Sequence, residues 1–169
     1  MPVHILNPGN VLITREPMQV ATVLGSCVAV CLHCARTQDA AICHALLPRP
    51  GANYEREAVA QHQGRYVSEI LPYMLHHFAR QGCATEEIVA KVFGGASITP
   101  KRVSEELSKE IGVNNVAEVF KILLEAKLLI RATITGGKRG HHIIFNTGTG
   151  EILHRLLNQT ATNRSFLHG

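Results

Sequence analysis

An apolar run between residues 22 and 32 places a thiol directly after a break in the backbone pattern. Gly25 and Ser26 interrupt the run, and Cys27 then leads into the aliphatic and β-branched stretch Val28–Leu32. A short apolar run bounded by glycine and free of charge predicts a buried strand. Glycine permits a sharp approach to that strand, so the amides around Ser26 and Cys27 could converge on one point. The run therefore predicts a β-rich core with a candidate nucleophile, Cys27, at a strand's mouth.

A cysteine needs a base to act as a nucleophile, and the sequence offers His44. An ordinary thiol has a pKa of about 8.5 and is scarcely ionised at neutral pH, so acyl chemistry requires a neighbouring imidazole. His44 lies in a second apolar run that ends at Pro48. Two neighbouring strands would bring Cys27 and His44 together. Buried cysteines and hydrogen-bonded core histidines are nevertheless commoner than catalytic ones, so the pair alone leaves packing and catalysis both open.

Length and composition favour one compact domain. The chain has 169 residues, of which 46% are hydrophobic, which is enough for a sizeable core. We expect a single domain over residues 1–157 and a flexible C-terminal tail over residues 158–169. The formal net charge of +4, from 17 basic and 13 acidic residues, is modest and scattered, so it does not predict a nucleic-acid partner.

The sequence also predicts a cytoplasmic protein without membrane insertion. The N-terminus lacks a basic region followed by a long apolar core, and no apolar run reaches the length of a membrane-spanning helix. The five cysteines form an odd number in a chain too large to need disulfide staples, which favours reduced thiols. The sequence has no heptad pattern of the kind that predicts a coiled-coil dimer, so we expect a monomer.

Helical and strand periods alternate along the rest of the chain. Apolar residues at helical spacing predict one helix over residues 67–78 and a second over residues 116–124, with Leu124 on its buried face. Asn115 and Glu118 resemble a capping box at the start of the second helix, and Thr99–Pro100 is expected to begin a separate short helix ending near Ile111. Predicted strands cover residues 11–14, 28–32, 87–93, 128–134, 141–147 and 151–156.

One glycine pair and one loop are further candidates for site-lining segments, whereas a second glycine pair is not. Gly94 and Gly95 follow a predicted strand, where they allow close backbone approach or simply a tight turn. Residues 48–63 lack apolar periodicity and are expected to form a loop overhanging the site. Gly136 and Gly137 precede a lysine but lack the spacing of a phosphate-binding loop, so a nucleotide site is not expected.

Metal binding is the competing chemistry for the cysteines. Cys27, Cys31 and Cys34 have the spacing of an iron–sulfur motif, but on an extended strand Cys27 and Cys31 would lie roughly 13 Å apart, too far to share a cluster. Zinc held by Cys31, Cys34, Cys43 and His33 lacks the second ligand pair usual for such sites. We therefore expect neither a metal nor another cofactor.

A series of motifs resembles the CheD family of chemoreceptor glutamine deamidases. These motifs follow one another over about residues 8–156, nearly the whole chain: TVLGSCVAVCL from Thr22, His44 before Ala-Leu-Leu-Pro, AKVFGGA from Ala90, IGVNNV from Ile111 and TGGKRG from Thr135. The resemblance implies a cysteine hydrolase in which Cys27 is the nucleophile, His44 the base and Thr22 the residue that orients the imidazole. Gly25, Ser26, Gly94 and Gly95 would line the oxyanion and substrate site.

The same resemblance implies a fold and partners. The expected class is α+β: a mixed, largely antiparallel β core in a layered sandwich, with two main helices packed outside, as in deamidating toxins. The implied substrates are methyl-accepting chemotaxis receptors, whose glutamine side chains become glutamates, and glutamyl methyl esters are a further candidate. The implied protein partner is a CheC-type phosphatase, and the alternative function is a non-catalytic adaptor that binds the receptor and stimulates that phosphatase.

Overall fold

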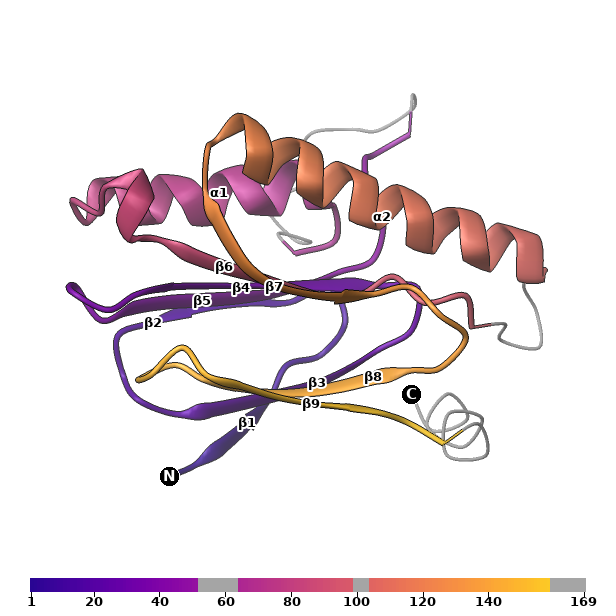
Figure 1. Cartoon of the computed structure of the whole chain (residues 1–169), viewed down its shortest axis with the longest axis horizontal. Coiled ribbons are helices and arrows are strands. Elements are labelled where there is room, and N and C mark those ends of the chain that lie inside the picture. The colour runs from indigo at the N-terminus through magenta and orange to yellow at the C-terminus, as the bar shows by residue number, and fades with distance from the viewer. Residues whose placement is uncertain (52–63, 99–103, 159–169) are drawn as a thin grey trace.

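Two β-sheets and two helices stack in three layers. The computed structural model describes residues 1–51, 64–98 and 104–158. In Figure 1 both helices lie over one face of the five-stranded sheet, and the four-stranded sheet covers the other face. This arrangement confirms the predicted α+β class with a sandwich core and helices outside. The helices are α1 (Val67–Arg80) and α2 (Glu105–Glu125), and a short 3-10 turn, η2, spans Thr85–Glu87.

Strand pairing is mostly antiparallel in both sheets. The four-stranded sheet has the order β1-β3-β8-β9, and the five-stranded sheet has the order β2-β5-β4-β6-β7; only the β1–β3 and β6–β7 pairs are parallel. The strands of the first sheet are β1 (Val3–Ile5), β3 (Gln19–Leu24), β8 (His141–Asn146) and β9 (Ile152–Leu156). Those of the second are β2 (Val11–Thr14), β4 (Val28–Cys34), β5 (Asp39–Ala45), β6 (Val89–Gly94) and β7 (Leu129–Thr135).

Strand β4 explains why the apolar run shows no alternation of apolar and polar residues. Every residue of β4 is buried, because one face of the strand meets the helices and the other meets the four-stranded sheet. Val28, Val30 and Leu32 pack in the core beneath α1 and α2. Ala29 and Cys31 pack in the core between the sheets. A central strand covered on both faces thus sets the position of the segment that begins with Cys27.

Helix α2 differs from the prediction. It is one continuous helix, whose N-cap is Ser104 with its hydroxyl accepting a hydrogen bond from the Leu107 amide at 3.1 Å. Asn115 is a buried residue in its middle rather than a cap, and Leu124 is exposed rather than buried. The predicted helix start at Thr99–Pro100 lies outside the described residues. The local signals failed because tertiary contacts hold Gly112 and Asn115 inside the helix, as described below.

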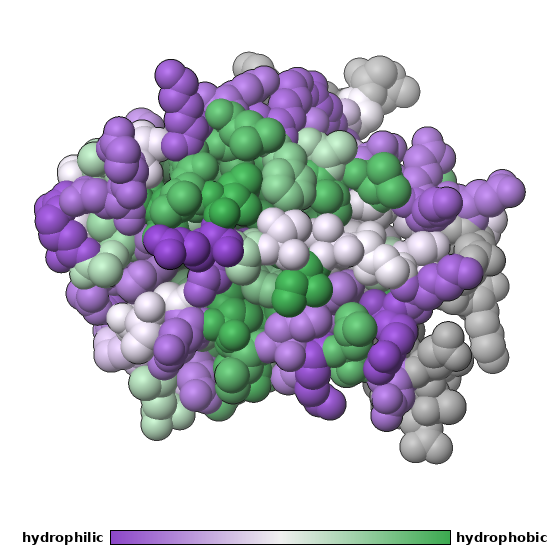
Figure 2. All heavy atoms as spheres, in the orientation of Figure 1, coloured by the Kyte–Doolittle hydropathy of each residue, from purple (hydrophilic) through white to green (hydrophobic). Residues whose placement is uncertain are grey.

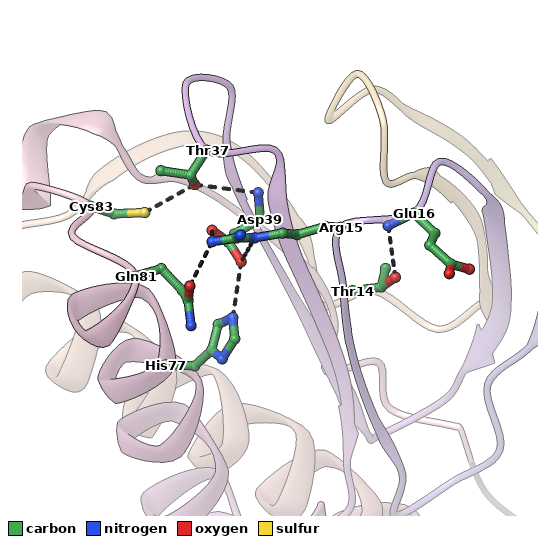
Figure 3. A network of polar contacts seen from close by, with 8 residues as sticks. All are labelled: Thr14, Arg15, Glu16, Thr37, Asp39, His77, Gln81 and Cys83. Atoms are coloured by element: carbon green, nitrogen blue, oxygen red, sulfur yellow. Dashed lines mark hydrogen bonds and ion pairs between the residues drawn. The ribbon is translucent and has the colours of Figure 1, made fainter.

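A polar network ties the end of α1 to the sheet, on the side away from Cys27. The carboxylate of Asp39, 1% exposed, receives two hydrogen bonds from Arg15 at 3.1 Å and one from His77 Nε2 at 3.0 Å (Figure 3). Burial by itself would raise the Asp39 pKa, but these donors and Thr37 outweigh it and lower that pKa. Asp39 begins β5 and His44 lies five residues further along, about 17 Å at strand spacing. The network is therefore an anchor for α1, remote from the candidate site.

Apolar side chains also reach the surface. Figure 2 shows them gathered across the face where α2 and β7 lie in Figure 1. Val113 and Leu124 of α2 and Leu129 and Ile134 of β7 are among the exposed large hydrophobic residues. Strand β7 is an edge of the five-stranded sheet. None of the described helices is both long and apolar enough to span a lipid bilayer.

Candidate active site

The segment before β4 presents Cys27 at the end of the strand. Residues 25–27 connect β3 of one sheet to β4 of the other, so the thiol sits where the chain passes between the sheets. Cys27 is partly exposed, unlike the other four cysteines, which are buried, and all five are free thiols. The nucleophile candidate is therefore the one cysteine that a substrate can approach.

The loop after β6 holds this segment in place. The Gly95 amide donates a hydrogen bond to the Cys27 carbonyl at 2.8 Å, and the Ala96 amide donates one to the Gly25 carbonyl at 2.8 Å. Gly94 has φ of +102°, and a Cβ there would lie only 2.3 Å from the Cys27 carbonyl oxygen. Glycine is thus required for the contact. Gly94 and Gly95 therefore lie against the backbone of Cys27, the close backbone approach that the sequence pattern predicted.

His44 reaches the same face of the sheet. In the β4–β5 ladder Ala29 pairs with His44, and opposite residues in a ladder project to the same side. Cys27 lies two residues before Ala29, so the strand period directs it to that face too. His44 is only 2% exposed, and its contact with Thr22 of β3 places it between the two sheets.

Thr22 orients the imidazole through a hydrogen bond between the sheets. Thr22, on β3, lies 2.7 Å from His44 Nδ1 through its Oγ1, and its hydroxyl donates to the Leu6 carbonyl at 2.8 Å. A carbonyl can only accept, so the single hydroxyl hydrogen is committed to Leu6. Nδ1 must therefore carry a hydrogen and donate it to Thr22, which leaves the lone pair on Nε2. This is the tautomer that a general base requires.

Burial keeps both candidate groups neutral at rest. Burial raises the pKa of the Cys27 thiol to about 11, against a smaller opposing effect of its own backbone N–H. Burial also lowers the pKa of His44 to about 4. Neutral imidazole can accept a proton and neutral thiol can supply one, so the pair suits proton transfer during attack rather than a resting ion pair.

The lowered pKa of His44 predicts an acid-sensitive fold. Between its ordinary pKa of 6.5 and the folded value of about 4, the unfolded chain takes up a proton that the folded chain does not. Stability is therefore present above pH 6.5 and lost as the pH falls toward 4, by up to about 3 kcal/mol. Urea unfolding at pH 7, 5.5 and 4.5 measures how far the free energy of unfolding falls with pH. The fall should be smaller in His44→Gln, because the contribution of His44 is then missing. Parallel pH dependences in the two proteins would contradict the assignment.

The cysteine spacing that resembles a metal motif is divided between two faces of one strand. Cys31 packs between the sheets, whereas Cys34 packs beneath the helices. Strand alternation thus directs their sulfur atoms to opposite sides of β4, where they cannot share one ion. Among residues 1–51, 64–98 and 104–158, no three His, Cys, Asp or Glu side chains are grouped to hold a metal.

Two further residues at the site were not identified as such from the sequence. The Leu6 carbonyl fixes the direction of the Thr22 hydroxyl, and Asn115 donates hydrogen bonds beside both the thiol segment and the end of β5. A backbone acceptor leaves no side-chain signal at all. For Asn115 the only signal was its place in the IGVNNV motif. The predicted overhanging loop lies outside the described residues from residue 52 to residue 63.

Comparison with known proteins places the chain in one family. The family model described as CheD chemotactic sensory transduction matches residues 46–156. The chain is 35% identical over 160 residues to a probable chemoreceptor glutamine deamidase CheD 2 of Geobacter sulfurreducens, covering 95% of this chain and 93% of the relative. It is 34% identical to the probable CheD deamidase of Trichlorobacter lovleyi, with 89% and 88% covered. It is 29% identical to the chemoreceptor glutamine deamidase CheD of Thermotoga maritima, with 89% and 90% covered. The chain therefore belongs to the CheD family of chemotaxis proteins.

Proposed function

We propose that the protein hydrolyses glutamine side-chain amides of methyl-accepting chemoreceptors to glutamate, with release of ammonia. The carrying observation is the hydrogen-bond chain from His44 Nδ1 through Thr22 to Leu6, which leaves Nε2 as a base on the face shared with Cys27. The names of the relatives support the substrate class. Free thiols in all five cysteines support a cytoplasmic location.

In the first half of the reaction Cys27 attacks the carboxamide carbon. As the S–C bond forms, the thiol proton passes to His44 Nε2, since neither group is ionised beforehand. The imidazolium and the developing negative charge then stabilise each other. Collapse of the tetrahedral intermediate breaks the C–N bond, His44 returns its proton to the leaving nitrogen, and ammonia departs. The product is a thioester between Cys27 and the receptor side chain.

In the second half water hydrolyses the thioester. His44 accepts a proton from water as its oxygen attacks the carbonyl carbon, the C–S bond breaks, and the sulfur recovers the proton. Glutamate is released, and Cys27 and His44 return to their neutral forms. A glutamyl methyl ester fits the same sequence of steps with methanol as the leaving group, so we include esterase activity in the proposal.

The oxyanion of both tetrahedral intermediates would lie beside the turn before β4. We assign its donors to the backbone amides of Ser26 and Cys27, in the turn that Gly25 opens. The Gly95 amide is already committed to the Cys27 carbonyl. Gly94 and Gly95 accordingly form the wall that keeps the Cys27 backbone in place, and no metal or cofactor takes part in the proposed reaction.

Removal of the Thr22 hydroxyl should slow turnover without removing either reacting group. Thr22→Val leaves the Nδ1 hydrogen and the Leu6 carbonyl unpaired and frees the imidazole to change tautomer. We expect kcat to fall about 100-fold, within the usual contribution of a positioned base. Thr22→Ser keeps the hydroxyl and should retain most activity. Receptor deamidation assayed by mass spectrometry measures both.

Thr147→Val is the matched control for Thr22. Thr147 is also a buried threonine whose hydroxyl both accepts and donates: it accepts from the Met18 amide and donates to the Glu16 carbonyl, with the Met18 carbonyl a more distant acceptor at 3.3 Å. It lies at the far end of β8, beyond Asn146, away from Cys27. Equal losses of activity in the two valine variants would show that Thr22 acts through stability alone.

The family also suggests a CheC-type phosphatase as a partner. A non-catalytic adaptor that binds receptors and stimulates this phosphatase is the competing function. The oriented imidazole, on the face shared with a partly exposed thiol, supports the enzyme, because an adaptor has no need of a defined tautomer.

Peptide mass mapping of a cognate receptor's cytoplasmic segment tests the proposal. Incubation with the wild-type protein should convert specific glutamines to glutamates and release one equivalent of ammonia per site. Receptor that remains unmodified at every glutamine, while a CheC-type phosphatase is bound and stimulated, would replace the enzyme with the adaptor.

A further inference from the structure

One face of α2 contacts three segments around the candidate site: the loop after β6, the turn before β4 and the chain just after β5. Gly112, Asn115 and Glu118 recur at intervals of three and so lie along the same side of the helix. A Cβ on Gly112 would lie 2.6 Å from the Gly95 carbonyl oxygen, so the helix backbone packs directly on the loop that holds Cys27. At the other end of the face, the Glu118 carboxylate accepts from Nε and Nη2 of Arg49, just beyond β5, each at 2.9 Å.

Asn115, between them, joins the nucleophile segment to the base strand. Its Nδ2 donates to the Ser26 carbonyl at 2.9 Å and to the Leu46 carbonyl at 3.1 Å. Ser26 immediately precedes Cys27, and Leu46 lies two residues after His44. Both acceptors are carbonyls, so only the amide NH2 group can serve them, and the orientation of the side chain is settled by this requirement.

These two bonds act where the sheet no longer connects the two segments. The β4–β5 ladder ends with the pair Val28–Ala45, one residue short of Cys27. The two hydrogens of one planar NH2 group diverge at a fixed angle, so they also fix the separation of the two carbonyls. Asn115 thereby replaces the next rung of the ladder with a side-chain rung.

The Asn115 side chain would destabilise the fold if packing were its only role. Asn115 is 0% exposed, and its Oδ1 has no hydrogen-bond partner among the residues that the structure describes. An unpaired buried acceptor usually costs about 1–3 kcal/mol, and asparagine is also a poorer helix former than alanine or leucine. A residue with these costs, placed between the two reacting segments, points to a role in their geometry.

We propose that Asn115 is a positioning residue that sets the separation between Cys27 Sγ and His44 Nε2. The inference rests on the proposed function, because it assigns Asn115 to the same Cys–His pair. Loss of the two bonds lets the thiol segment move relative to β5. A displacement of about 1 Å between reacting groups typically lowers turnover about 100-fold.

A double-mutant cycle distinguishes positioning from general support of the fold. Asn115→Ala keeps a good helix former in α2, and we expect kcat to fall about 10- to 100-fold with KM changed less than about threefold. The factor lost on His44→Gln should shrink at least about tenfold in the Asn115→Ala background, since a misplaced thiol gains little from the base. A purely structural role would leave that factor unchanged.

Ser108→Ala supplies the matched control. Ser108 is a buried polar residue on the same helix, and its hydroxyl donates to the Ile98 carbonyl. Its removal should lower stability but leave kcat and the His44→Gln factor as in the wild type. Equal factors in the wild-type and Asn115→Ala backgrounds would overturn the inference.

Alkylation of Cys27 by iodoacetamide, followed at the peptide level, gives a readout that needs no receptor. The rate should fall in His44→Gln, and it should fall by a smaller factor when Asn115 is alanine. If the His44→Gln effect on alkylation depends on Asn115 but the protein modifies no receptor, the proposed deamidase function fails and the positioning role of Asn115 stands. If the protein deamidates the receptor but the effects of Asn115→Ala and His44→Gln are additive, the deamidase function stands and the positioning role fails. An alkylation rate that does not depend on His44 would overturn the inference as well.

Discussion

Replacement of Cys27 by alanine should reduce receptor deamidation by more than about four orders of magnitude, because no other group can form the thioester. Serine should be almost as damaging. A hydroxyl is a weaker nucleophile than a thiol, and it is harder for the neutral His44 imidazole to deprotonate. Ammonia release and peptide mass mapping at equal protein concentration measure the loss. A thioester-linked receptor fragment on Cys27, trapped by rapid acid quenching of the wild type, should be missing from both variants.

Cys31→Ala is the control for the Cys27 variants. Cys31 lies on the same strand, four residues away, but is buried between the sheets. Its truncation removes a thiol and tests stability without touching the reaction. Deamidation that survives Cys27→Ala would require a different nucleophile, and deamidation lost equally in Cys31→Ala would show that the Cys27 variants act through stability.

Replacement of His44 by glutamine should lower kcat by about two to four orders of magnitude, the usual contribution of general acid–base catalysis. Glutamine can still hydrogen-bond to Thr22, so the fold is expected to persist at neutral pH. Because burial lowers the pKa of His44 to about 4, the wild-type activity should depend on pH in an unusual way. The imidazole must be neutral to act, so kcat/KM should stay high through pH 6 and decline only near pH 4.

The acid limb of that profile should disappear in His44→Gln, whose residual rate no longer depends on a histidine. His33→Gln is the control, since His33 lies on the same face of β4 but at the far end of the strand. Burial lowers the pKa of His33 too. His33→Gln therefore also removes a buried histidine with a lowered pKa, but one that is remote from Cys27. An acid limb retained in His44→Gln would transfer the base role to another group.

The sequence was most informative where local pattern and final environment agree. The run Val28–Leu32 predicted a buried strand, and β4 is buried throughout because layers cover both of its faces. Gly94 and Gly95 predicted a close backbone approach: the Cys27 carbonyl occupies the space where a Gly94 side chain would begin, and α2 occupies that space at Gly95. The prediction that Cys27 and His44 lie on neighbouring strands needed only the assumption that the two apolar runs are adjacent, which the β4–β5 ladder satisfies.

Elsewhere the decisive contacts are too distant in sequence for local pattern to reveal. Asn115 bonds to residues 89 and 69 positions away, and these contacts keep it inside a helix that its own propensity would begin or end. Strands β1 and β3 were not predicted either. The three residues of β1 are all exposed, so they carry no burial pattern, and they pair with β3 across a long connection.

Because Thr22 and His44 belong to different sheets, the proposed catalytic activity depends on how the two sheets are packed against each other. The imidazole belongs to the five-stranded sheet and the hydroxyl that orients it to the four-stranded sheet. If one sheet slid over the other, the Thr22–His44 hydrogen bond would break and the His44 ring would no longer be held in one tautomer, although every strand stayed intact. Any ligand, neighbouring protein or distant core substitution that alters the registry of the layers could therefore tune the enzyme without approaching its thiol.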